Sequence, residues 1–449
     1  MSEIKLGSFR GGVFPLHEIH GGKDLTKDMP IAQMPAPDIA VYPMAQHIGA
    51  PCVPNVNKGD RVLIGQEIGS MKGFVSAPIH ASVSGEVVAL EQKLTISGSP
   101  VLSVLVKNDG KDEWVEDIQE RTPGEIAALS AQDIRAIVKK CGVVGLGGAS
   151  FPTHIKITPP PDNAIDTIII NGAECEPYLT SDHRLMLEQP EKLIGGIKLI
   201  IRAIGGGPRA VIAVENNKKD AISLLDGLLK AEKNISVKAL EVKYPQGSEK
   251  HLITSITKRQ VPSGKLPASA GCLVVNVGTA IAIYDAVHHG RPIVDTVISA
   301  TGDLNRPGVF LVRTGTPVQQ VIDHCGGFKP DVTKVISGGP MMGISIYDYS
   351  VPIIKSTSSL LAMTDKHAGI APQTKCLRCG RCVKACPMFL MPAVLNRLSV
   401  MQNWEEADRY NALDCVECGS CTYICPAKLN ITSNIRRAKR AVMSARKRS

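Results

Sequence analysis

The chain has 449 residues and a formal net charge of +9; 44% of its residues are hydrophobic and only 4% are aromatic. This length predicts about three domains. No long uncharged apolar stretch and no apolar N-terminal segment occur, so we expect neither a transmembrane helix nor a signal peptide. The 13 cysteines include two closely spaced runs that need reduced thiols, so we expect a cytosolic protein without a disulfide framework.

Residues 1–34 are expected to form an irregular arm. Residues 35–112 contain short β segments broken by Pro and Gly, in two related strand–turn–strand units. They resemble the barrel-sandwich hybrid of biotinyl and lipoyl carriers. Those carriers have a Lys at the hairpin tip, whereas the tip here reads Ile79-His80-Ala81-Ser82. We therefore expect a structural domain rather than a covalent carrier.

Residues 120–290 predict a parallel α/β domain. Ser130 and Asp133 form a capping-box pattern at the start of its first helix. Apolar strands then alternate with helices, which is typical of a parallel sheet. The expected strands are residues 164–171, 209–215, 235–244 and 272–278.

A Gly-rich loop and a set of polar residues mark the candidate ligand site of this domain. Gly142, Gly145, Gly147 and Gly148 allow the backbone to turn and to present N–H groups to a phosphate. A plain turn is the alternative, since a helix rather than a strand precedes the loop. Sheets of this class bind ligands beyond the carboxyl ends of their strands. The polar and Gly residues expected there are Asn171, Glu174, Glu176, Gly247, Glu249, Asn276 and Thr279.

Residues 291–350 predict a smaller unit of strands and one short helix, with an Asn-Arg-Pro-Gly turn at 305–308. This pattern resembles a β-grasp (SLBB) domain.

Residues 360–430 hold two runs with the spacing C-x2-C-x2-C-x3-C-P, the bacterial ferredoxin pattern for 4Fe-4S clusters, in which the fourth Cys of each run ligates the other cluster. Structural zinc is the alternative, but zinc sites use paired C-x2-C units rather than triple runs. Helix formers between the runs predict a helical ferredoxin module with two clusters. The pattern assigns Cys376, Cys379, Cys382 and Cys425 to one cluster, and Cys415, Cys418, Cys421 and Cys386 to the second.

Residues 431–449 are expected to form a basic tail. This local charge indicates an acidic partner or an anionic membrane surface rather than nucleic acid. A solvated helix end without a partner is the alternative. From Ala427 onward there is no acid, and the bases are Lys428, Arg436, Arg437, Lys439, Arg440, Arg446, Lys447 and Arg448.

Three segments of the α/β domain resemble the flavoprotein subunit of respiratory complex I: GLGGASFPTHIK (145–156), NGAECEPY (171–178) and VVNVGT (274–279). The resemblance implies that Phe151 stacks on NAD(H), whose hydroxyls bind Glu176 and Glu249. It also implies bound FMN. The residues implied for the FMN phosphate are Gly145, Gly147, Gly148 and Lys156, and those implied for the rest of FMN are Asn171, Glu174, Tyr244, Gly247, Asn276 and Thr279. The departures from the family motifs are Leu146, Ala173 and Ser248.

The order of the units extends the resemblance. A multidomain α/β plus β chain of barrel-sandwich hybrid, parallel α/β flavin/NADH domain, β-grasp domain and helical two-cluster module is similar to the RnfC/RsxC family. Members are subunits of Rnf ion-translocating ferredoxin:NAD oxidoreductase complexes. The resemblance implies an NADH-dependent oxidoreductase in which FMN converts hydride transfer into single-electron transfer. Hydride passes directly from nicotinamide to flavin, so no catalytic acid or base is expected.

The same resemblance implies a peripheral subunit on the cytoplasmic side of the cell inner membrane. Its partners would be the membrane subunits of the complex and a ferredoxin-like subunit. Two alternatives stay open. One is a soluble NADH-dependent cobalamin reductase of the same architecture. The other is a scaffold that has lost the flavin and keeps only the clusters.

Overall fold

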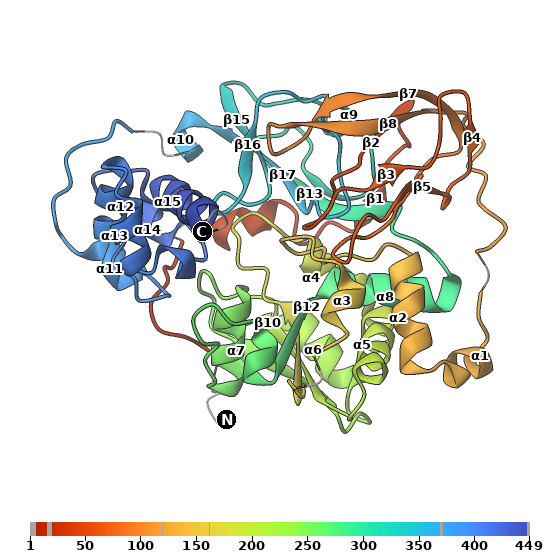
Figure 1. Ribbon diagram of the computed structural model, residues 1–449, viewed down its shortest axis with the longest axis horizontal. Helices are drawn as coiled ribbons and strands as arrows, with labels where there is room; N and C mark the ends of the chain where they lie inside the picture. Colours follow the sequence, from red (N-terminus) through yellow and green to blue (C-terminus); the bar gives the residue numbers. More distant parts are fainter. Residues whose placement is uncertain (1–5, 16–19, 119, 161, 369–370, 447–449) are drawn as a thin grey trace.

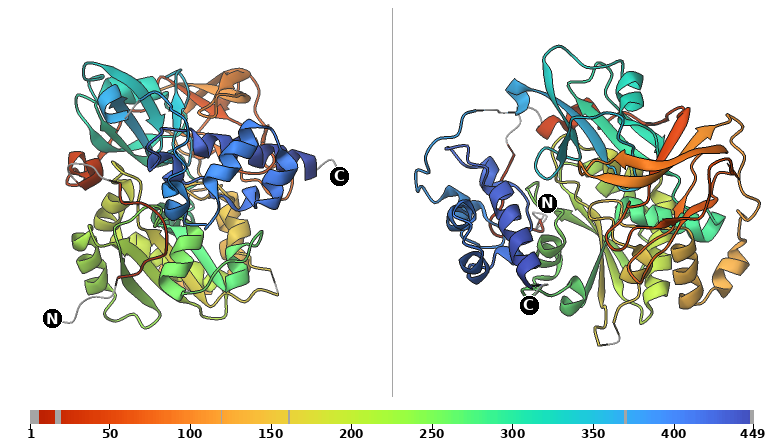
Figure 2. Two further views of the ribbon diagram at one scale, coloured as in Figure 1. Left: turned by 90° about the vertical axis from the view of Figure 1, so that its left-hand side faces the viewer. Right: turned by 45° about the horizontal axis from the view of Figure 1, so that its top comes forward.

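The computed structural model describes residues 6–15, 20–118, 120–160, 162–368 and 371–446. The described residues form an α/β unit, two β units and a helical module (Figure 1). In that view the α/β unit lies below the two β units, and the helical module lies beside them, as Figure 2 also shows. The mixed architecture that the sequence predicted is therefore present.

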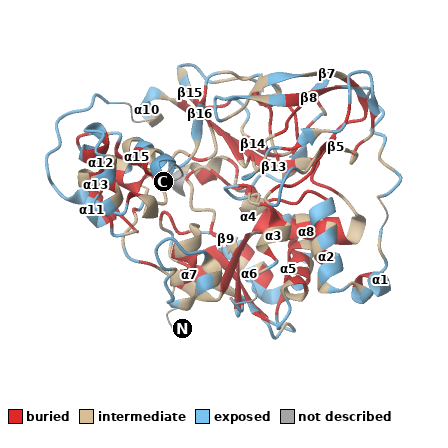
Figure 3. Cartoon of the chain, viewed as in Figure 1, coloured by how far each residue is buried: buried red, intermediate tan, exposed pale blue. Residues whose placement is uncertain are grey.

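The α/β domain is built on a four-stranded parallel sheet with the order β11-β10-β9-β12. Its strands are almost wholly buried (Figure 3) because they are the most apolar runs of the domain. Helices α2, α4, α5, α6 and α8 pack on one face and α7 on the other. The strands are β9 (Thr167–Gly172), β10 (Arg209–Glu215), β11 (Ile235–Leu240) and β12 (Cys272–Asn276). The helices are α1 (Pro123–Ala128), α2 (Ala131–Lys140), α3 (Thr153–Lys156), α4 (Ser181–Glu188), α5 (Pro190–Ile204), α6 (Lys219–Leu228), α7 (Glu249–Thr257) and α8 (Val277–His289), with a 3-10 turn at Pro267–Ala270.

The capping box predicted for α2 is present. The side chain of Ser130 accepts a hydrogen bond from the N–H of Asp133, and the carboxylate of Asp133 accepts one from the N–H of Ser130. Two backbone donors at the start of the helix are satisfied in this way.

The barrel-sandwich domain consists of two small antiparallel sheets around one apolar core. Its expected hairpin tip is buried: Ile79, His80, Ala81 and Ser82 are at most 5% exposed. A tip packed in this way cannot swing like the tip of a carrier domain. The strands are β2 (Ile39–Pro43), β3 (Val53–Pro54), β4 (Arg61–Val62), β5 (Glu67–Ser70), β6 (Ile79–His80), β7 (Gly85–Leu94) and β8 (Pro100–Asn108).

The β-grasp unit is a six-stranded sheet with the order β1-β14-β13-β17-β15-β16. Two of its strands lie outside the expected range 291–350. Strand β1 comes from the arm and pairs with β14, and β17 pairs with β13 and β15. The arm is thus partly regular, since its apolar residues complete a sheet edge. The elements are β1 (Ile31–Gln33), β13 (Asp295–Gly302), β14 (Gly308–Arg313), α9 (Val318–His324), β15 (Val332–Ser337), β16 (Ile344–Ile346) and β17 (Ser359–Thr364), with a 3-10 helix at His20–Leu25 in the arm.

The segment expected to be a basic tail forms the longest helix of the helical module. The buried residues of α15 follow a helical spacing and pack against α12 and α13. Glu417 receives Arg436 at 2.6 Å and Lys439 at 2.9 Å, so several of the bases act within the module. Lys447 and Arg448 lie outside the described residues. The helices are α10 (Asp365–Ala368), α11 (Arg381–Ala385), α12 (Pro392–Val400), α13 (Trp404–Arg409), α14 (Ser420–Tyr423) and α15 (Ile431–Arg446), with a 3-10 turn at Ala412–Asp414.

Candidate functional site

The carboxyl edge of the parallel sheet brings two of the expected polar residues together. Asn171 lies at the end of β9 and Asn276 at the end of β12, and they are register partners in adjacent strands. The chain continues from β9 to β10 and β11 on one side, and then places β12 on the other side of β9. The strand order therefore reverses between β9 and β12, which is where sheets of this class bind ligands.

The Gly-rich loop is anchored next to this reversal point. The Leu146 N–H donates to Thr279 Oγ1 at 2.9 Å, and the Gly145 N–H donates to the Phe151 carbonyl at 2.9 Å. Thr279 belongs to the first turn of α8. The loop is thereby tied both to itself and to the helix that follows β12.

The tip of the loop presents free backbone donors. Gly147 lies so close to Asn276 that a Cβ at this position would stand 2.6 Å from Asn276 Nδ2. Gly147, Gly148 and Ala149 are exposed, and no group in the described part of the chain accepts a hydrogen bond from their N–H groups. Adjacent free N–H groups in a turn bind phosphate, so the loop fits the phosphate of FMN.

The barrel-sandwich tip supports the start of this loop. Nζ of the buried Lys355 donates to the Pro78 carbonyl at 2.6 Å and to the Gly142 carbonyl at 2.8 Å. Gly142 has a φ of +61°, a conformation that Gly adopts without steric cost. Residues of three units are joined here, directly before the loop.

Asn276 connects the loop to buried carboxyl groups. Its Oδ1 caps α8 by accepting from the Gly278 N–H at 2.8 Å, and its Nδ2 donates to Asp182 at 2.8 Å. The Asp182 N–H donates to Glu174 at 2.8 Å. Burial and the neighbouring Glu174 carboxylate raise the pKa of Asp182 to about 7. The sheet edge therefore holds two adjacent carboxyl groups, one of which retains a proton at slightly acidic pH.

A lysine from the arm supplies positive charge next to these carboxyl groups. Lys23 Nζ lies 3.8 Å from Glu174 Oε2. It donates to the carbonyls of Glu174 at 2.9 Å, Glu176 at 3.0 Å and Leu179. Burial lowers the pKa of Lys23. Lys23 thus fixes the backbone of the segment that carries both expected glutamates.

A second buried pair follows the end of β10. Lys218 Nζ lies 3.5 Å from Glu215 Oε2 and donates to the Ala173 carbonyl at 2.7 Å. We call these side chains together with those of the two preceding paragraphs the inner charge network: Lys23, Glu174, Asp182, Glu215 and Lys218.

The sequence analysis identified only Glu174 in this network. Glu215 closes an apolar strand and Lys218 follows three residues later, which is the same type of signal that marked Asn171. Lys23 carries no local signal, because the carbonyl it binds at Glu174 lies 151 residues further along the chain.

Asn171 and Gly247, both expected at the site, are in direct contact. Asn171 Nδ2 donates to the Gly247 carbonyl at 2.8 Å, and the Gly247 N–H donates to Cys175 Sγ at 3.2 Å. Burial raises the pKa of the Cys175 thiol. These bonds join the loops that follow β9 and β11.

Lys156 and Glu249 form an ion pair with each other. Their side chains are 27% and 44% exposed, so this pair, which we call the outer pair, is open to solvent. Phe151 is half-buried and directly precedes α3, the helix that ends with Lys156.

Glu176 and Tyr244 lie where the α/β domain meets the other units. Glu176 accepts from the N–H groups of Met341 at 3.0 Å and Met342 at 2.9 Å, both in the β-grasp unit. The Tyr244 hydroxyl donates to the Cys418 carbonyl at 2.6 Å and lies 3.4 Å from Glu176. Burial raises the pKa of Glu176 to about 7. Two residues expected at the flavin site therefore reach the cysteine module.

Several of the eight cysteines of the two runs are neighbours. Burial raises the pKa of the Cys382 thiol, and nearby Cys425 acts in the same direction. Burial also raises the pKa of the Cys421 thiol to about 11, and Cys418 and Cys386 add to this. Within the described residues no three ligating side chains are gathered tightly enough to hold a metal ion. Thiolates are the ligands of 4Fe-4S clusters, so the donor chemistry fits. The buried cysteines are Cys382, Cys386, Cys418, Cys421 and Cys425, Cys415 is half-buried, and Cys376 and Cys379 are exposed.

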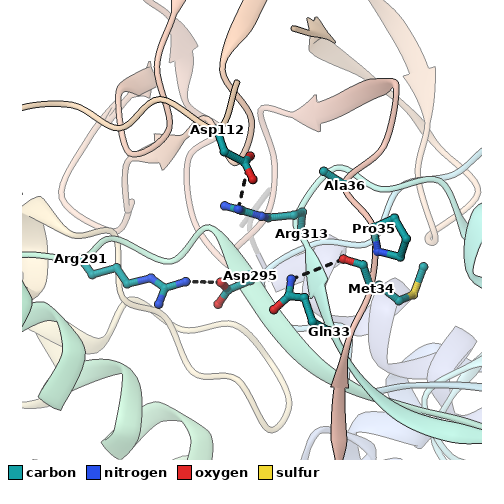
Figure 4. A pocket seen from close by; sticks show the side chains of 8 residues that line it. All are labelled: Gln33, Met34, Pro35, Ala36, Asp112, Arg291, Asp295 and Arg313. Carbon is teal, nitrogen blue, oxygen red and sulfur yellow. Dashed lines mark hydrogen bonds and ion pairs between the residues drawn. The ribbon is translucent and has the colours of Figure 1, made fainter. Parts of the chain in front are cut away.

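A separate cavity of about 320 Å³ lies between the arm, the β-grasp unit and the linker after the barrel-sandwich domain (Figure 4). Its charged groups neutralise one another, since Arg291 pairs with Asp295, and Arg313 lies 3.5 Å from Asp112. It contains none of the residues expected at the flavin site.

A phosphate-binding loop at the reversal point of a parallel sheet, in contact with a module of two cysteine runs, defines a redox protein that uses flavin and iron–sulfur clusters. Family models match each unit: the RnfC barrel sandwich hybrid domain over residues 7–111, the Nuo51 FMN-binding domain over 138–285, the SLBB domain over 297–345 and the 4Fe-4S dicluster domain over 369–430. These matches confirm the predicted fold class and the predicted FMN and 4Fe-4S cofactors.

Curated relatives cover nearly the whole chain. The RnfC protein of the Na(+)-translocating ferredoxin:NAD(+) oxidoreductase complex of Acetobacterium woodii is 45% identical over 99% of this chain and 99% of the relative. Its counterpart in the proton-translocating ferredoxin:NAD(+) oxidoreductase complex of Clostridium ljungdahlii is 45% identical over 96% and 93%. The counterpart in the ion-translocating oxidoreductase complex of Rhodobacter capsulatus is 40% identical over 87% and 74%. The chain therefore belongs to the RnfC family, whose members are subunits of ion-translocating oxidoreductase complexes.

No helix in the described part of the chain is both long enough and apolar enough to span a membrane.

Proposed function

We propose that this chain is the NADH-binding flavin and iron–sulfur subunit of an Rnf-type complex. It passes electrons between NAD(H), FMN and two 4Fe-4S clusters, and the complex couples ferredoxin:NAD oxidoreduction to ion translocation. The observation that carries this proposal is the 2.6 Å hydrogen bond from Tyr244 to the Cys418 carbonyl. It places the cysteine module directly against the domain that has the phosphate-binding loop.

FMN, when bound, accepts a hydride from NADH and gives up its electrons one at a time, a conversion that no side chain of the protein can perform. The chain's own residues bind and orient the reactants. The free N–H groups of Gly147 and Gly148 hold the phosphate, and Lys156 adds positive charge by exchanging its ion-pair partner Glu249 for the phosphate. No proton needs to be moved by a side chain at the reacting atoms.

The remaining expected residues keep their proposed positions with one refinement. Asn171, Gly247, Asn276 and Thr279 shape the floor of the flavin site at the strand ends, and Phe151 stacks on the nicotinamide nucleotide. The residues in the same proposal that the chain places at domain contacts are Glu174, Glu176 and Tyr244, so we assign them a positioning role beside the flavin.

The departures from the family motifs leave the flavin site intact. Leu146 contributes its N–H to Thr279, a contact that any residue could make. Ala173 is fully buried in the core beside α7, and Ser248 lies at the N-terminal end of α7. Because none of the three occupies the exposed edge of the loop, they do not favour the scaffold alternative. The relatives' names do not favour a cobalamin reductase.

We further propose attachment to the membrane subunits of the complex on the cytoplasmic side of the inner membrane, together with a ferredoxin-like subunit. NADH and the reduced thiols required for cluster assembly are both found in the cytoplasm, which supports this side.

Cofactor analysis of the anaerobically purified chain tests the proposal. We expect about one FMN and about eight iron and eight sulfide per chain, and bleaching of the flavin by NADH. The Phe151→Ala variant should retain FMN but bind NADH more weakly by about 0.5–1.5 kcal/mol, the value of an aromatic stacking contact. Protein that is loaded with clusters but binds no FMN would favour the scaffold alternative instead.

A further inference from the structure

The two cysteine runs have the same spacing, but they face different surroundings. Cys418 of the second run lies against Tyr244 in a small apolar cluster with Val13 and Ala385. A Cβ on the next residue, Gly419, would stand only 2.7 Å from the carbonyl of Met341 in the β-grasp unit. The second run is therefore enclosed by the flavin domain, the arm and the β-grasp unit.

The end of the first run faces the same way. The Gly12 N–H of the arm donates to the Ala385 carbonyl at 2.9 Å, and the ring of His251 on α7 lies 3.2 Å from the Pro387 carbonyl. The residue between these two contacts is Cys386, which the spacing assigns to the cluster of the second run. Both contacts thus place that cluster on the flavin side of the module.

The start of the first run faces solvent. All residues of 371–380 are exposed, including Cys376 and Cys379. Among the described residues, the hydrogen bonds of this segment stay within the module; the Thr374 N–H, for example, donates to the Ala427 carbonyl. In Figure 1 the chain between α10 and α11 runs along the outer edge of the module, away from the α/β domain.

We propose that the cluster held by Cys415, Cys418, Cys421 and Cys386 exchanges electrons with the flavin, and that the cluster held by Cys376, Cys379, Cys382 and Cys425 is the terminal one that faces the external partner. This inference rests on the proposed function. One NADH yields NAD+, one proton and two electrons, and each cluster takes up one electron, so a single NADH can fill both.

The surface around the terminal cluster indicates the kind of partner. From Ala371 to Met391 the chain contains no acidic residue. Four bases in this stretch are exposed, and so are the apolar side chains of Leu377 and Phe389, at 65% and 66%. An apolar centre with a basic rim fits a redox protein that carries acidic groups around its own cofactor, because opposite charge steers the encounter. The bases are Lys375, Arg378, Arg381 and Lys384.

The order of the clusters is tested by removing one at a time from the full chain. In the Cys418→Ala variant the remaining cluster should be reduced by dithionite but at least ten-fold more slowly by NADH, while the flavin still bleaches. In the Cys379→Ala variant the remaining cluster should be reduced by NADH at the wild-type rate. The opposite pattern overturns the proposal. Iron content and the EPR spectrum of the dithionite-reduced protein confirm which cluster each variant retains.

Two further measurements keep the outcome interpretable. Photoreduction of the bound flavin supplies electrons without NADH, so the cluster order is read even if NADH is not the donor; failure of NADH alone to bleach the wild-type flavin contradicts only the proposed function. In the wild-type chain, a soluble paramagnetic nickel complex should relax the EPR signal of the later-reduced cluster more strongly, because that cluster faces solvent. Stronger relaxation of the earlier signal contradicts the order.

The exit surface is tested with small acceptors of opposite charge. The Arg378→Glu/Lys384→Glu variant should reduce ferricyanide several-fold more slowly, with a weaker dependence on ionic strength, and should not slow toward hexaammineruthenium(III). The matched control is Lys72→Glu/Lys111→Glu, which changes two exposed bases of the barrel-sandwich region. Equal rates in the two double variants, or an unchanged ferricyanide rate in Cys379→Ala, contradict this exit.

Discussion

Two groups of charges lie around the proposed flavin site, and they differ in burial. In the inner charge network the side chains of Lys218 and Glu215 are each 2% exposed, whereas in the outer pair Lys156 and Glu249 are 27% and 44% exposed. The inner charges bind backbone carbonyls and each other, while the outer charges have only one another and water.

This difference separates structural residues from residues that are free to bind a ligand. A buried charge that loses its partner remains uncompensated, which costs several kcal/mol, so the inner network cannot exchange partners during turnover. An exposed ion pair contributes about 0–1 kcal/mol and can open at little cost. We therefore expect the inner network to hold the site together and the outer pair to contact the ligand.

The largest effect is expected for Lys23→Met, which removes one member of the inner network. Glu174 and three carbonyls would lose their buried donor, so the free energy of unfolding should fall by about 3–5 kcal/mol. Lys27→Met is the matched control, because Lys27 lies in the same arm and forms only an exposed pair with Asp24. Denaturant unfolding measures both. An equally small loss in the two variants would mean that the inner network is not structural.

The next largest effect is expected for Gly147→Val, which places a side chain against Asn276 in the loop beside the inner network. The loop must shift, and its N–H groups lose their arrangement, so FMN should be lost from the purified protein. Gly148→Ala is the control, because a Cβ at that position meets no atom within 4 Å. Flavin content after gel filtration measures the effect. Full FMN occupancy in Gly147→Val would show that the phosphate binds elsewhere.

An intermediate effect is expected for Lys156→Met in the outer pair. The free energy of unfolding should change by no more than about 1 kcal/mol, while FMN affinity should fall by about 1.5–3 kcal/mol, the value of a hydrogen bond to a charged group. Lys139→Met, an exposed base at the end of α2, should change neither quantity. Fluorescence titration of the apoprotein with FMN and with riboflavin distinguishes a phosphate contact, because only FMN binding should weaken.

The smallest effect is expected for Asp182→Asn. The pKa of Asp182 is raised from 3.8 to about 7, so between these values the folded chain holds a proton that the unfolded chain has released. The contribution of Asp182 to stability therefore falls as the pH rises from about 4 to about 7. Asn keeps the acceptor for Asn276 but does not titrate, so the variant should lose less stability than the wild type between about pH 5 and pH 8. Parallel curves for the two proteins would contradict the raised pKa.

The sequence allowed prediction of those features that depend on local pattern. The strand expected at 209–215 is β10, and the capping box at Ser130 opens α2, because alternation of apolar strands with helices and capping residues act within a few positions. The expected loop lies at the reversal of strand order, since carboxyl ends of parallel strands meet at one edge.

Features that depend on distant contacts could not be predicted. Strand β1 forms only because β14 offers an edge, and Lys23 becomes a site residue only because the arm passes over the segment after β9. The bases after residue 430 signalled an open tail, but Ile431, Ile435, Ala438 and Val442 are spaced to bury one helix face. Charge dominated the interpretation of that segment, although its apolar spacing decides the structure.

Anaerobic stopped-flow mixing of the reconstituted wild-type chain with NADH tests the central claim most directly. The flavin absorbance should bleach first, and the absorbance of the iron–sulfur clusters should decrease afterwards without any added mediator. Cluster reduction that precedes flavin bleaching, or flavin bleaching that is never followed by cluster reduction, would contradict a path from NADH through the flavin domain into the cysteine module.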